Sequence, residues 1–529
     1  MRDPLVTARS AAQVDAEASA SWGLNAFALV EAAGRLCAQA LCGRFPDLLA
    51  LPNLRICAVV GSGNNGADAL VALRALILEG HITAGNALAL TSGLPQEGEQ
   101  SPRSAALQAL GSLGVRILLW ETPSASPLGT ESVTIGYAAA AALLKTMDCI
   151  LDGIAGTGLR LPLAGPQREM VELLSELTNG DMRGQKKPII VSIDMPSGLT
   201  DGWQPDMPLV RAQATLAIEP LKLALYTPAA RTYCGEIVPI RSLFPRSLMV
   251  HHADAELLCW EDLSRELPPL EGDSYKYSRG VVAIHAGSPG SAGAARIAAQ
   301  GAQAAGGGLV RLILDQELYP ILAGSSGGIM VLARDSAEVR FQPDALLLGP
   351  GWGKGSERIP VMDEAGRLER EGIPLVLDAD AIWLSQERRY SGSAIMTPHP
   401  GEFAALTGIP KERVLANPIP FLTEAAQQWG AVFCYKGHVL YIVAPDGRVG
   451  ILDGMAPALA TGGTGDLLAG FCVAIAARMK NLPQGFDGYV AAALAASLLL
   501  ACARGEQHFL DPLDLGKKAA GIAGKAWLA

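Results

Sequence analysis

The 529-residue chain has few aromatic residues and few charges, which excludes several classes of protein. Aromatic residues make up 5% and charged residues 18%, while half of the residues are hydrophobic, so global disorder is excluded. Basic residues (42) are fewer than acidic residues (52), so the chain lacks the overall positive charge that favours nucleic acids or anionic membranes. A small basic pocket for a phosphorylated metabolite is still compatible with this composition.

Patterned cysteines and long apolar runs are also missing. The nine cysteines are scattered without a CxxC pair, which indicates reduced, buried thiols and no disulfide framework or zinc site. The longest apolar stretch, residues 489–503, is shorter than the ~20 residues that span a bilayer, so we interpret it as a core helix. The first residues lack the apolar region of a secretion signal. We therefore expect a soluble, cytoplasmic protein.

Glycine is abundant and recurs where a short apolar run changes into an Ala/Leu-rich helical pattern. This happens in RICAVVGSGNNGADALVALRALILEG, from Arg55, and in GVVAIHAGSPGSAGAARIAAQGAQAAGGGLVRLIL, from Gly280. A strand, a glycine turn and a helix form the unit of an α/β fold with a parallel sheet. Further buried strands are predicted in DCILDGIAG, PIIVSIDMPSG, DALLLGPGWG, PLVLDADA and AVFCYKG.

The strand pattern lapses between Arg241 and Asp273, in a segment rich in charge and proline. We place the domain boundary there, which gives two domains, residues 1–245 and 246–529. The adjacent His251 and His252 are interpreted as a solvated linker pair. The absence of short internal repeats excludes solenoid folds.

The first glycine turn, GSGNNG at residues 61–66, matches the GxGxxG spacing of dinucleotide-binding turns. The acid expected some 20 residues later is missing, because the next strand ends in Thr91 and Ser92. A hydride-transferring dehydrogenase is therefore disfavoured. Spacing alone is equally compatible with a turn that needs glycine only for steric reasons.

Polar side chains collect at the expected sheet edge of the first half. Amide and carboxylate groups can coordinate a hard cation or hold ribose hydroxyls, although each alone is more often a cap or turn residue. Because carboxyl ends of parallel strands share one edge, the sequence predicts a polar pocket that could bind a metal ion. The residues are Asn64, Asn65, Asp68, Asp152, Asp194 and Ser197.

In the second half, ATGGTGDLLAG at residues 460–470 places glycines before an apolar helix. Backbone N–H groups at such a helix start suit a phosphate, and Asp466 could take a proton from a substrate hydroxyl. The alternative is a glycine turn in which Asp466 is a helix N-terminal charge. The pattern GxxxxGK[ST] is absent there, so a P-loop NTPase is disfavoured.

Other polar groups follow the strands of the second half. Asp378 and Asp380 follow PLVL and are equally compatible with capping the next helix or lining a ligand cleft. His399, between two prolines and three residues before Glu402, favours ligand contact. Lys436, after AVFCY, could place its ammonium near phosphates, although a single lysine is usually a surface group.

The motifs GSGNNGADALVALR, LDGIAGTGLRLPLAG and SIDMPSGLTDG resemble the NAD(P)H-hydrate epimerase (YjeF N-terminal) domain over about residues 10–240. The resemblance implies a Rossmann-like three-layer α/β/α domain that interconverts R and S epimers of hydrated NADH or NADPH beside a potassium ion. It implies a catalytic Asp194 and a potassium site of Asn65, Asp152 and Ser197. Implied contacts with the hydrated dinucleotide are Asn64, Asn65, Gly66, Ala67, Asp68, Gly156, Thr157, Gly158, Leu159, Arg160, Leu161, Pro162 and Asp194.

The family reads NNGGDG where this chain has alanine at positions 67 and 69. An added Cβ alters the turn if the backbone there approaches the ligand or takes a positive φ. A second hypothesis therefore stays open, in which the first half binds nucleotide without turnover.

Six motifs of the second half, GSPGSAGAARIAAQGAQAAGGGLV, LLLGPGWG, VLDADAIWL, MTPHPGEFAALTG, KGHV and ATGGTGDLLAG, resemble the ADP-dependent NAD(P)H-hydrate dehydratase domain over about residues 270–529. This resemblance implies a ribokinase-like α/β fold in which ADP phosphorylates the S hydrate and loss of phosphate restores the reduced nicotinamide. Phosphoryl transfer implies magnesium. Implied roles are Asp466 as base, hydrate contacts from Ala294, Gly353, His399 and Asp466, and nucleotide contacts from Lys436, Gly437, His438, Val439, Leu440 and Gly465.

The sequence therefore predicts a homo-oligomeric, bifunctional metabolite-repair enzyme that acts on NADH and NADPH hydrates, consumes ADP and binds neither nucleic acid nor membrane. The alternative is a ribokinase-like small-molecule kinase, because a GGTGD motif serves phosphoryl transfer there as well. The product distinguishes them: a stable phosphorylated alcohol, or free phosphate with reduced nicotinamide.

Overall fold

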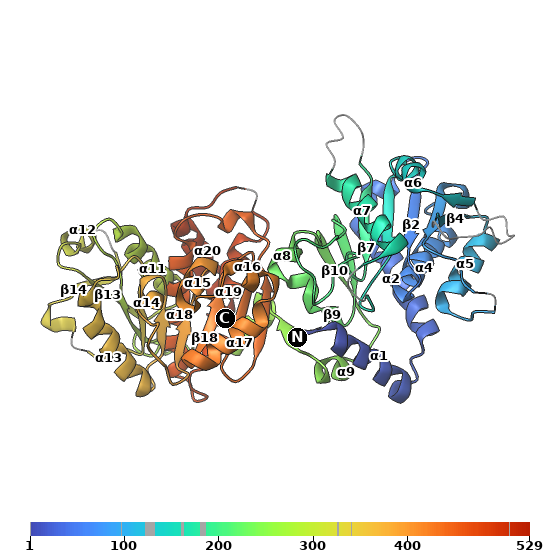
Figure 1. The fold of residues 1–529 in the computed structure, drawn as a ribbon. Helices are drawn as coiled ribbons and strands as arrows, with labels where there is room; N and C mark the ends of the chain where they lie inside the picture. The colour runs from blue at the N-terminus through green and yellow to red at the C-terminus, as the bar shows by residue number, and fades with distance from the viewer. Residues whose placement is uncertain are drawn as a thin grey trace. The chain divides into compact units, whose positions relative to one another are not determined.

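The computed structural model describes residues 2–96, 98–121, 133–159, 163–179, 187–324, 327–339, 341–506 and 508–528. The chain folds into two compact units (Figure 1). Pro4–Asp254 form the N-terminal unit, and the chain from Ala255 onward, with the residues before Pro4, forms the C-terminal unit.

The chain passes between the units after Asp254, later than the expected residue 245. The reason is α9 (Arg246–His251), whose buried Leu248 and Met249 pack with Val14 and Ala18 of α1 (Ala8–Trp22). His252 follows α9, and its Nε2 lies 2.9 Å from Glu17 Oε2 of α1. The interpretation of this histidine as solvated linker is therefore wrong.

The N-terminal unit contains a wholly parallel sheet in its described residues. Its strands follow the order β10 (Glu236–Ile240), β8 (Ala214–Ile218), β7 (Ile189–Ile193), β6 (Cys149–Gly153), β2 (Ile56–Val60), β3 (Ala87–Thr91), β4 (Arg116–Trp120), β5 (Val133–Ile135). The short β1 (Asp3–Val6) pairs with β9 (Leu221–Lys222).

Helices cover both faces of this sheet. On one face α2 (Ala26–Arg44), α4 (Asn64–Leu78) and α5 (Pro102–Ser112) bury their apolar residues, and on the other α6 (Tyr137–Leu144) and α7 (Gly165–Asn179) do so. The two apolar layers use alternate residues of the same strands, as a sheet buried on both sides requires. The expected Rossmann-like three-layer α/β/α architecture is confirmed.

Among the described residues, α2 is the one helix with the length and apolar composition of a membrane span. Its Cys37, Ala38 and Leu41 are buried in the core beside α4. At Gly34 a Cβ would come within 2.5 Å of Val71 Cβ in α4, so the two helices pack in close contact. This side of α2 is therefore buried in the core of the N-terminal unit.

The C-terminal unit has a second large sheet, parallel except where β19 runs antiparallel to its neighbours β18 and β20. Its strand order is β14 (Met330–Ala333), β13 (Leu309–Leu314), β12 (Val281–His285), β15 (Ala345–Leu348), β16 (Leu375–Leu377), β17 (Ala394–Met396), β18 (Ala431–Tyr435), β19 (Val439–Val443), β20 (Val449–Asp453), β11 (Ala255–Leu257).

One face of this sheet packs against α11 (Ala292–Ala304), α18 (Thr464–Lys480), α19 (Gly488–Ala503) and α20 (Pro512–Trp527). The other face packs against α15 (Pro400–Thr407) and α17 (Pro418–Trp429), where Phe403 and Trp429 contact Phe433 of β18. The expected two-domain α/β class is confirmed. The prediction of a core helix at residues 489–503 is also confirmed, because α19 is almost wholly buried.

Further helices complete both units. They are α3 (Pro46–Leu49), α8 (Pro228–Arg231), α10 (Trp260–Leu263), α12 (Tyr319–Ala323), α13 (Ile359–Arg370), α14 (Asp380–Trp383) and α16 (Lys411–Ala416). The 3₁₀ turns are η1 (Ala84–Asn86), η2 (Leu223–Tyr226), η3 (Ser264–Glu266), η4 (Ala337–Val339), η5 (Ser356–Arg358) and η6 (Pro457–Leu459). All nine cysteines are unpaired, and seven of them are buried.

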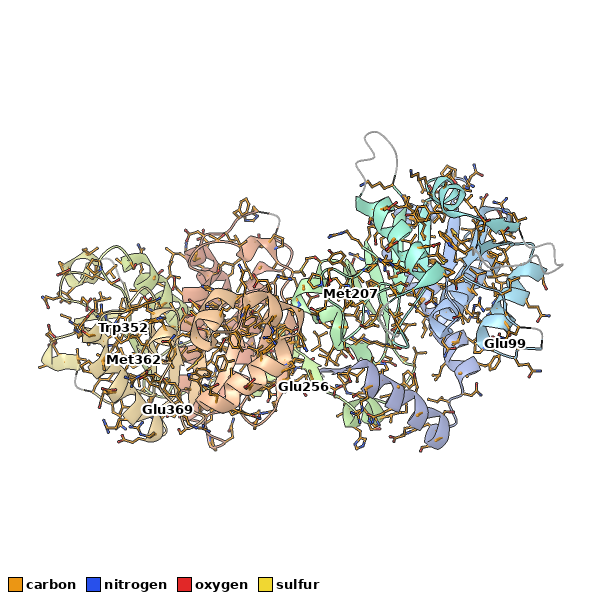
Figure 2. The ribbon with its side chains drawn as sticks, in the orientation of Figure 1. Glu99, Met207, Glu256, Trp352, Met362 and Glu369 are labelled. Carbon is orange, nitrogen blue, oxygen red and sulfur yellow. The ribbon has the colours of Figure 1, made fainter. Side chains whose placement is uncertain are left out.

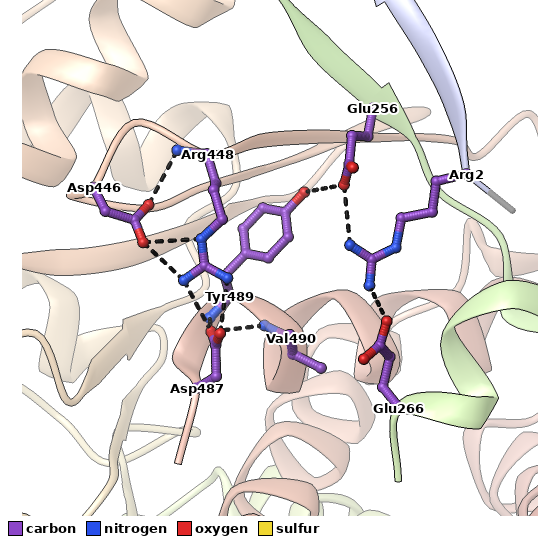
Figure 3. Close-up of polar contacts among 8 residues, drawn as sticks. All are labelled: Arg2, Glu256, Glu266, Asp446, Arg448, Asp487, Tyr489 and Val490. Atoms are coloured by element: carbon purple, nitrogen blue, oxygen red, sulfur yellow. Dashed lines mark hydrogen bonds and ion pairs between the residues drawn. The ribbon is translucent and has the colours of Figure 1, made fainter. Parts of the chain in front are cut away.

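An ionic network explains why the first residues belong to the C-terminal unit (Figure 3). Arg2 donates to Glu256 of β11 at 3.0 Å, and the Tyr489 hydroxyl donates to the same carboxylate at 3.5 Å. Asp487 caps α19 by accepting from the Tyr489 N–H and pairs with Arg448 at 2.7 Å. Residues from distant parts of the sequence are thereby fixed around the start of α19.

Candidate active sites

A cavity of about 690 Å³ lies at the carboxyl ends of the strands in the N-terminal unit. This is the size and position expected of a ligand site in an open α/β fold. The structure brings together at this cavity Asn64, Asn65, Asp68, Gly156, Thr157, Gly158, Leu159 and Asp194, all named from the sequence. Arg160, Leu161 and Pro162 lie outside the described residues.

The glycine turn before α4 is sterically required. At Gly61 a Cβ would lie 1.9 Å from the Ile154 carbonyl oxygen, and at Gly66 it would lie 2.8 Å from the Gly61 oxygen. The turn therefore lets the start of α4 approach β6, so that its first N–H groups face the cavity.

The alanines at 67 and 69 are buried within α4 and pack in the apolar core. Neither has a positive φ, and neither lines the cavity. Gly66 and Ala67 are thus next to the site without lining it. The alanine side chains point away from the cavity, so they give no support to a non-catalytic N-terminal domain.

Asp194 forms a buried ion pair with Lys222. Lys222 Nζ lies 2.5 Å from Asp194 Oδ1 and also donates to the Ile218 carbonyl at 2.8 Å. Asp194 follows β7 with φ 64°, a left-handed conformation that aspartate tolerates better than most residues. Its N–H donates to the Leu216 carbonyl of β8, which holds this conformation at the strand end.

The cavity is otherwise acidic. Lys222 is the one basic side chain among its described lining residues, while Asp15, Asp68, Asp194 and Glu219 are carboxylic acids. Burial raises the pKa of Asp68 well above its ordinary value, and the Asp194 carboxylate raises it further. Asp68 Oδ1 is buried without a hydrogen-bond partner. Protonated Asp68 can therefore donate a hydrogen bond to a ligand.

Asp152 lies behind the cavity and is fully buried. Its carboxylate accepts from Ser192 Oγ at 2.7 Å and from the Ser197 N–H and Oγ at 2.9 and 2.5 Å. These donors are neutral, and burial raises the pKa of Asp152. Asn65 in the adjoining first turn of α4 has a buried side-chain amide whose oxygen and nitrogen both lack partners. A buried anion beside an unpartnered amide oxygen fits a monovalent cation.

The second site lies at the carboxyl ends of β16, β17 and β18 in the C-terminal unit. Lys436 Nζ lies 2.7 Å from Asp378 Oδ1 and 3.8 Å from Glu402 Oε2, and Thr397 Oγ1 donates to the same Asp378 oxygen at 2.6 Å. Lys436 is therefore a half-buried partner of two acids and not a surface group. Asp378 binds Lys436 and Thr397 and makes no side-chain cap to α14.

Asp466 stands at the start of α18 beside this cluster. Burial raises its pKa to about 6, the Asp378 and Glu402 carboxylates add to the rise, and Lys436 opposes it. A Cβ on Gly465 would lie 3.3 Å from Lys436 Nζ, so the lysine reaches the first turn of the helix. Gly463 caps α18 in the left-handed region at φ 96°, which leaves the first N–H groups open to a phosphate.

The loop after β15 closes the other side of this edge. Asp380 Oδ2 accepts from the Gly353 N–H at 2.7 Å, and a Cβ on Gly351 would lie 3.0 Å from Ala294 Cβ in α11. Ala379 separates Asp378 from Asp380 with φ 47°, a strained conformation for alanine that directs the two carboxylates to different partners. Ala294 of α11 therefore packs against the loop that contains Gly353, and Asp380 holds this loop through the Gly353 N–H.

Trp352 of this loop lies in the C-terminal unit (Figure 2), and its side chain is buried against His285 and Arg358. Burial lowers the pKa of His285 to about 4, and Arg334 and Arg358 add to this effect. His285 is therefore neutral at physiological pH. Arg358 makes two bonds to Asp315, at 2.7 and 2.6 Å, which fix the outer side of the loop.

His399 forms the N-cap of α15. Its Nδ1 accepts from the N–H groups of Gly401 and Glu402, and Glu402 Oε2 accepts from the His399 N–H at 2.8 Å. This capping box fixes the ring, whose Nε2 lies 3.5 Å from Glu402 Oε1, and the side chain is exposed. Glu402 in turn contacts Lys436, which connects His399 to the acid–lysine cluster.

Lys436, Gly437 and His438 form the turn between β18 and β19. Val439 and Leu440 begin β19 and bury their side chains in the core. Contacts of Val439 and Leu440 with a nucleotide would therefore involve their backbone.

The charged residues of the N-terminal cavity that sequence reasoning did not single out include Lys222 and Asp15. Lys222 is the one charged residue within the apolar stretch at 221–226, a pattern that indicates a buried, paired lysine. Asp15 lies on an amphipathic helix with no turn motif nearby, so nothing in its local sequence indicates a site.

The two units define the class of protein: a two-domain α/β enzyme with a polar, carboxylate-rich site at the strand ends of each domain. Residues 26–224 match the family described as YjeF-related protein N-terminus, and residues 282–511 match the family described as NAD(P)H-hydrate dehydratase.

Bifunctional NAD(P)H-hydrate repair enzymes are similar over nearly the whole chain. The enzyme from Moorella thermoacetica is 29% identical over 93% of this chain and 91% of its own length. The Salinibacter ruber enzyme is 29% identical over 93% and 90%, and the Escherichia coli enzyme 28% over 92% and 87%. This chain also resembles the crystal structure of ADP/ATP-dependent NAD(P)H-hydrate dehydratase from Bacillus subtilis co-crystallised with ATP/Mg²⁺ (25% identity, 51% of this chain, 98% of that chain, TM-score 0.45).

The chain belongs to the family of bifunctional NAD(P)H-hydrate repair enzymes, with a YjeF-related N-terminal domain and an NAD(P)H-hydrate dehydratase C-terminal domain. The family resemblance expected from the motifs is therefore confirmed for both halves.

Replacing Lys222 by Met leaves the Asp194 carboxyl buried without its cation. We expect the free energy of unfolding of the N-terminal unit to fall by about 3–5 kcal/mol, and the Lys222→Met, Asp194→Asn double variant to recover most of this loss. Urea denaturation measures both. Arg44→Met, which breaks an exposed pair with Glu236 of the same unit, serves as control and should leave this free energy nearly unchanged. A similarly small change in Lys222→Met would contradict the role of the pair.

Proposed function

We propose that the N-terminal domain interconverts the R and S epimers of hydrated NADH and NADPH, and that the C-terminal domain dehydrates the S epimer with ADP as phosphoryl donor. The observation that carries this proposal is the pairing, at one sheet edge in each domain, of a buried lysine–carboxylate cluster with the open start of a helix. Such an edge binds a phosphorylated ligand and can move a proton beside it.

In the C-terminal domain, Asp466 takes the proton of the hydrate hydroxyl as its oxygen attacks the terminal phosphorus of ADP. The P–O bond to AMP breaks, and the hydroxyl becomes a phosphate ester. Because phosphate leaves far more readily than hydroxide, its departure with loss of a neighbouring C–H proton restores the ring double bond. Lys436 and the N–H groups at the start of α18 bind the transferring phosphoryl group.

Ala294, Gly353 and His399 hold the hydrate in this proposal, and the turn at residues 436–440 with Gly465 holds the nucleotide. Among the described residues no cluster of three or more His, Cys, Asp or Glu side chains could hold a metal ion. Magnesium, which neutralises phosphate charge when bound, would therefore enter mainly on the phosphates of ADP, the mode this ion commonly adopts.

In the N-terminal domain, the chemistry follows from the substrate. Water adds to an enamine double bond of reduced nicotinamide, so the hydroxyl sits on a carbon bonded to the ring nitrogen. Protonation of this hydroxyl releases water while the nitrogen lone pair forms a planar iminium ion. Water then adds to the opposite face and gives up a proton. Asp194 moves the proton on one face, Lys222 holds its carboxyl in place, and protonated Asp68 binds the hydrate with Asn64 and residues 156–159.

We propose that Asn65, Asp152 and Ser197 hold a potassium ion, which when bound supplies the positive charge that the buried Asp152 lacks. The cytoplasmic location and the homo-oligomeric state stay predictions.

The two activities should separate by mutation. Asp466→Asn removes the base, so we expect recovery of reduced nicotinamide from S hydrate to fall at least 100-fold while epimer exchange continues. Asp194→Asn should do the reverse. Epimer-mixed NADH hydrate with ADP and Mg²⁺, followed by absorbance and by chromatographic separation of the epimers, measures both. A stable phosphorylated alcohol as product would instead identify a small-molecule kinase.

The pH profile of dehydration should report Asp466. Its ionised form is the base and its pKa is raised to about 6, so kcat/KM should rise tenfold per pH unit below 6 and level off above it. Lys436 lowers this pKa, so Lys436→Met should move the inflection to higher pH, whatever it does to the rate. Lys411→Met, at the exposed start of α16, is the control. An inflection unmoved by Lys436→Met would reject the assignment.

Potassium should stabilise the N-terminal domain and speed epimerisation. We expect the Tm to rise when 100 mM tetramethylammonium chloride is replaced by 100 mM potassium chloride, and epimer exchange to accelerate in parallel. Asp152→Asn removes the buried negative charge while it keeps nearly the same side-chain shape. In this variant potassium should neither raise the Tm nor accelerate epimer exchange. Persistence of the potassium-dependent Tm rise in this variant would place the ion elsewhere.

A further inference from the structure

Helix α1 presents one face to the N-terminal cavity. Cavity-lining residues recur at the spacing of one helix face: Ala8, Ala11, Ala12, Asp15 and Ser19. On its other side Val14 and Ala18 pack against Leu248 and Met249. The helix is therefore fixed from behind, and its small side chains leave Asp15 as the one charged group that this face extends into the cavity.

Asp15 shares its surroundings with the proposed catalytic pair. Partial burial raises its pKa, the Lys222 ammonium opposes this rise, and the Asp194 carboxylate adds to it. The other nearby acid, Asp68, is also influenced by Asp15. Asp15 and Asp68 thus line the same cavity as the Asp194–Lys222 pair, and a cluster of three acids and one cation retains a proton more readily than isolated acids do.

The two additional acids differ in how accessible they are. Asp68 is 8% exposed, and its Oδ1 is fully enclosed. Asp15 is exposed to the cavity and comes from α1, whereas Asp194 comes from the end of β7. Asp15 can therefore approach a bound ring from a different wall than Asp194.

Epimerisation requires proton transfer on both faces of the planar iminium ion, because water leaves from one face and adds to the other. We propose that Asp15 is the second acid–base residue of the epimerase site, acting on the ring face opposite to Asp194. This inference rests on the proposed epimerase function.

For one direction, the Asp15 carboxyl gives its proton to the hydroxyl, the C–O bond breaks, and water departs as the ring nitrogen supplies the electron pair of the C=N bond. A second water then forms a C–O bond on the other face, the C=N electrons return to nitrogen, and Asp194 accepts the released proton. In the reverse direction the two residues exchange roles. No oxidant or reductant is needed. After one turnover Asp15 has lost a proton and Asp194 has gained one, and exchange with solvent restores both carboxyl groups.

The test uses the full-length chain. We expect Asp15→Asn to lower kcat for epimer exchange, measured without ADP in both directions, at least 100-fold with a smaller change in KM. Asp15→Glu, which keeps the carboxyl, should recover part of the rate. Glu17→Gln removes one negative charge from the same helix at a residue outside the cavity, and it should exchange epimers at the wild-type rate.

The outcomes separate the inference from the proposed function. If the wild-type chain does not exchange epimers, the epimerase function itself fails. If it does, and Asp15→Asn keeps the wild-type kcat or changes KM alone, Asp15 is not an acid–base residue. Loss of exchange in Asp68→Asn with full kcat in Asp15→Asn would assign the second role to Asp68. The Tm of the N-terminal domain and its potassium-dependent rise should be unchanged in Asp15→Asn, which shows that this domain is folded.

Discussion

Strand polarity in a parallel sheet is the constraint on which both sites depend. Every strand of such a sheet ends at the same edge, so residues far apart in sequence meet there without any local signal that joins them. In the N-terminal domain the ends of β2, β6 and β7 bring together the start of α4, residues 156–159 and Asp194. In the C-terminal domain the ends of β16, β17 and β18 bring together Asp378, Thr397 and Lys436. Glycine turns then let a helix start approach this edge.

Electrostatics distinguishes the groups that meet at these edges. Some carboxylates at these edges are paired with a lysine, whereas a buried carboxylate without a cation holds its proton to higher pH. Asp194 and Asp378 are of the first kind, with Lys222 and Lys436. Asp68 and Asp152 are of the second kind, with raised pKa values. Asp466 lies between these limits, at the pKa of about 6 that suits a base near neutral pH.

Much of the site could be predicted because its backbone requirements are local. Gly61 and Gly66 occur where an added Cβ would meet carbonyl oxygens, and Gly463 has a left-handed φ. Because only glycine meets these requirements, the glycines form a pattern that is visible in the sequence alone. Asp15 leaves no comparable pattern, since an aspartate on an amphipathic helix is compatible with many folds, and the apolar stretch around Lys222 indicates a paired lysine without identifying its partner. Their role depends on neighbours that the chain brings near only when folded.

The sequence by itself determined the α/β class, the two domains and the family, because glycine turns, apolar strand runs and their order are properties of adjacent residues. It also located most of the polar groups at the strand ends. Tertiary structure decided which of these groups are paired, buried or open to a ligand. It turned His399 into a helix cap that contacts Glu402, directed the side chains of Ala67 and Ala69 away from the cavity, and placed Asp15 of α1 at the cavity wall. The physical reason is that burial and charge pairing are set by contacts between distant segments, which a linear pattern does not specify.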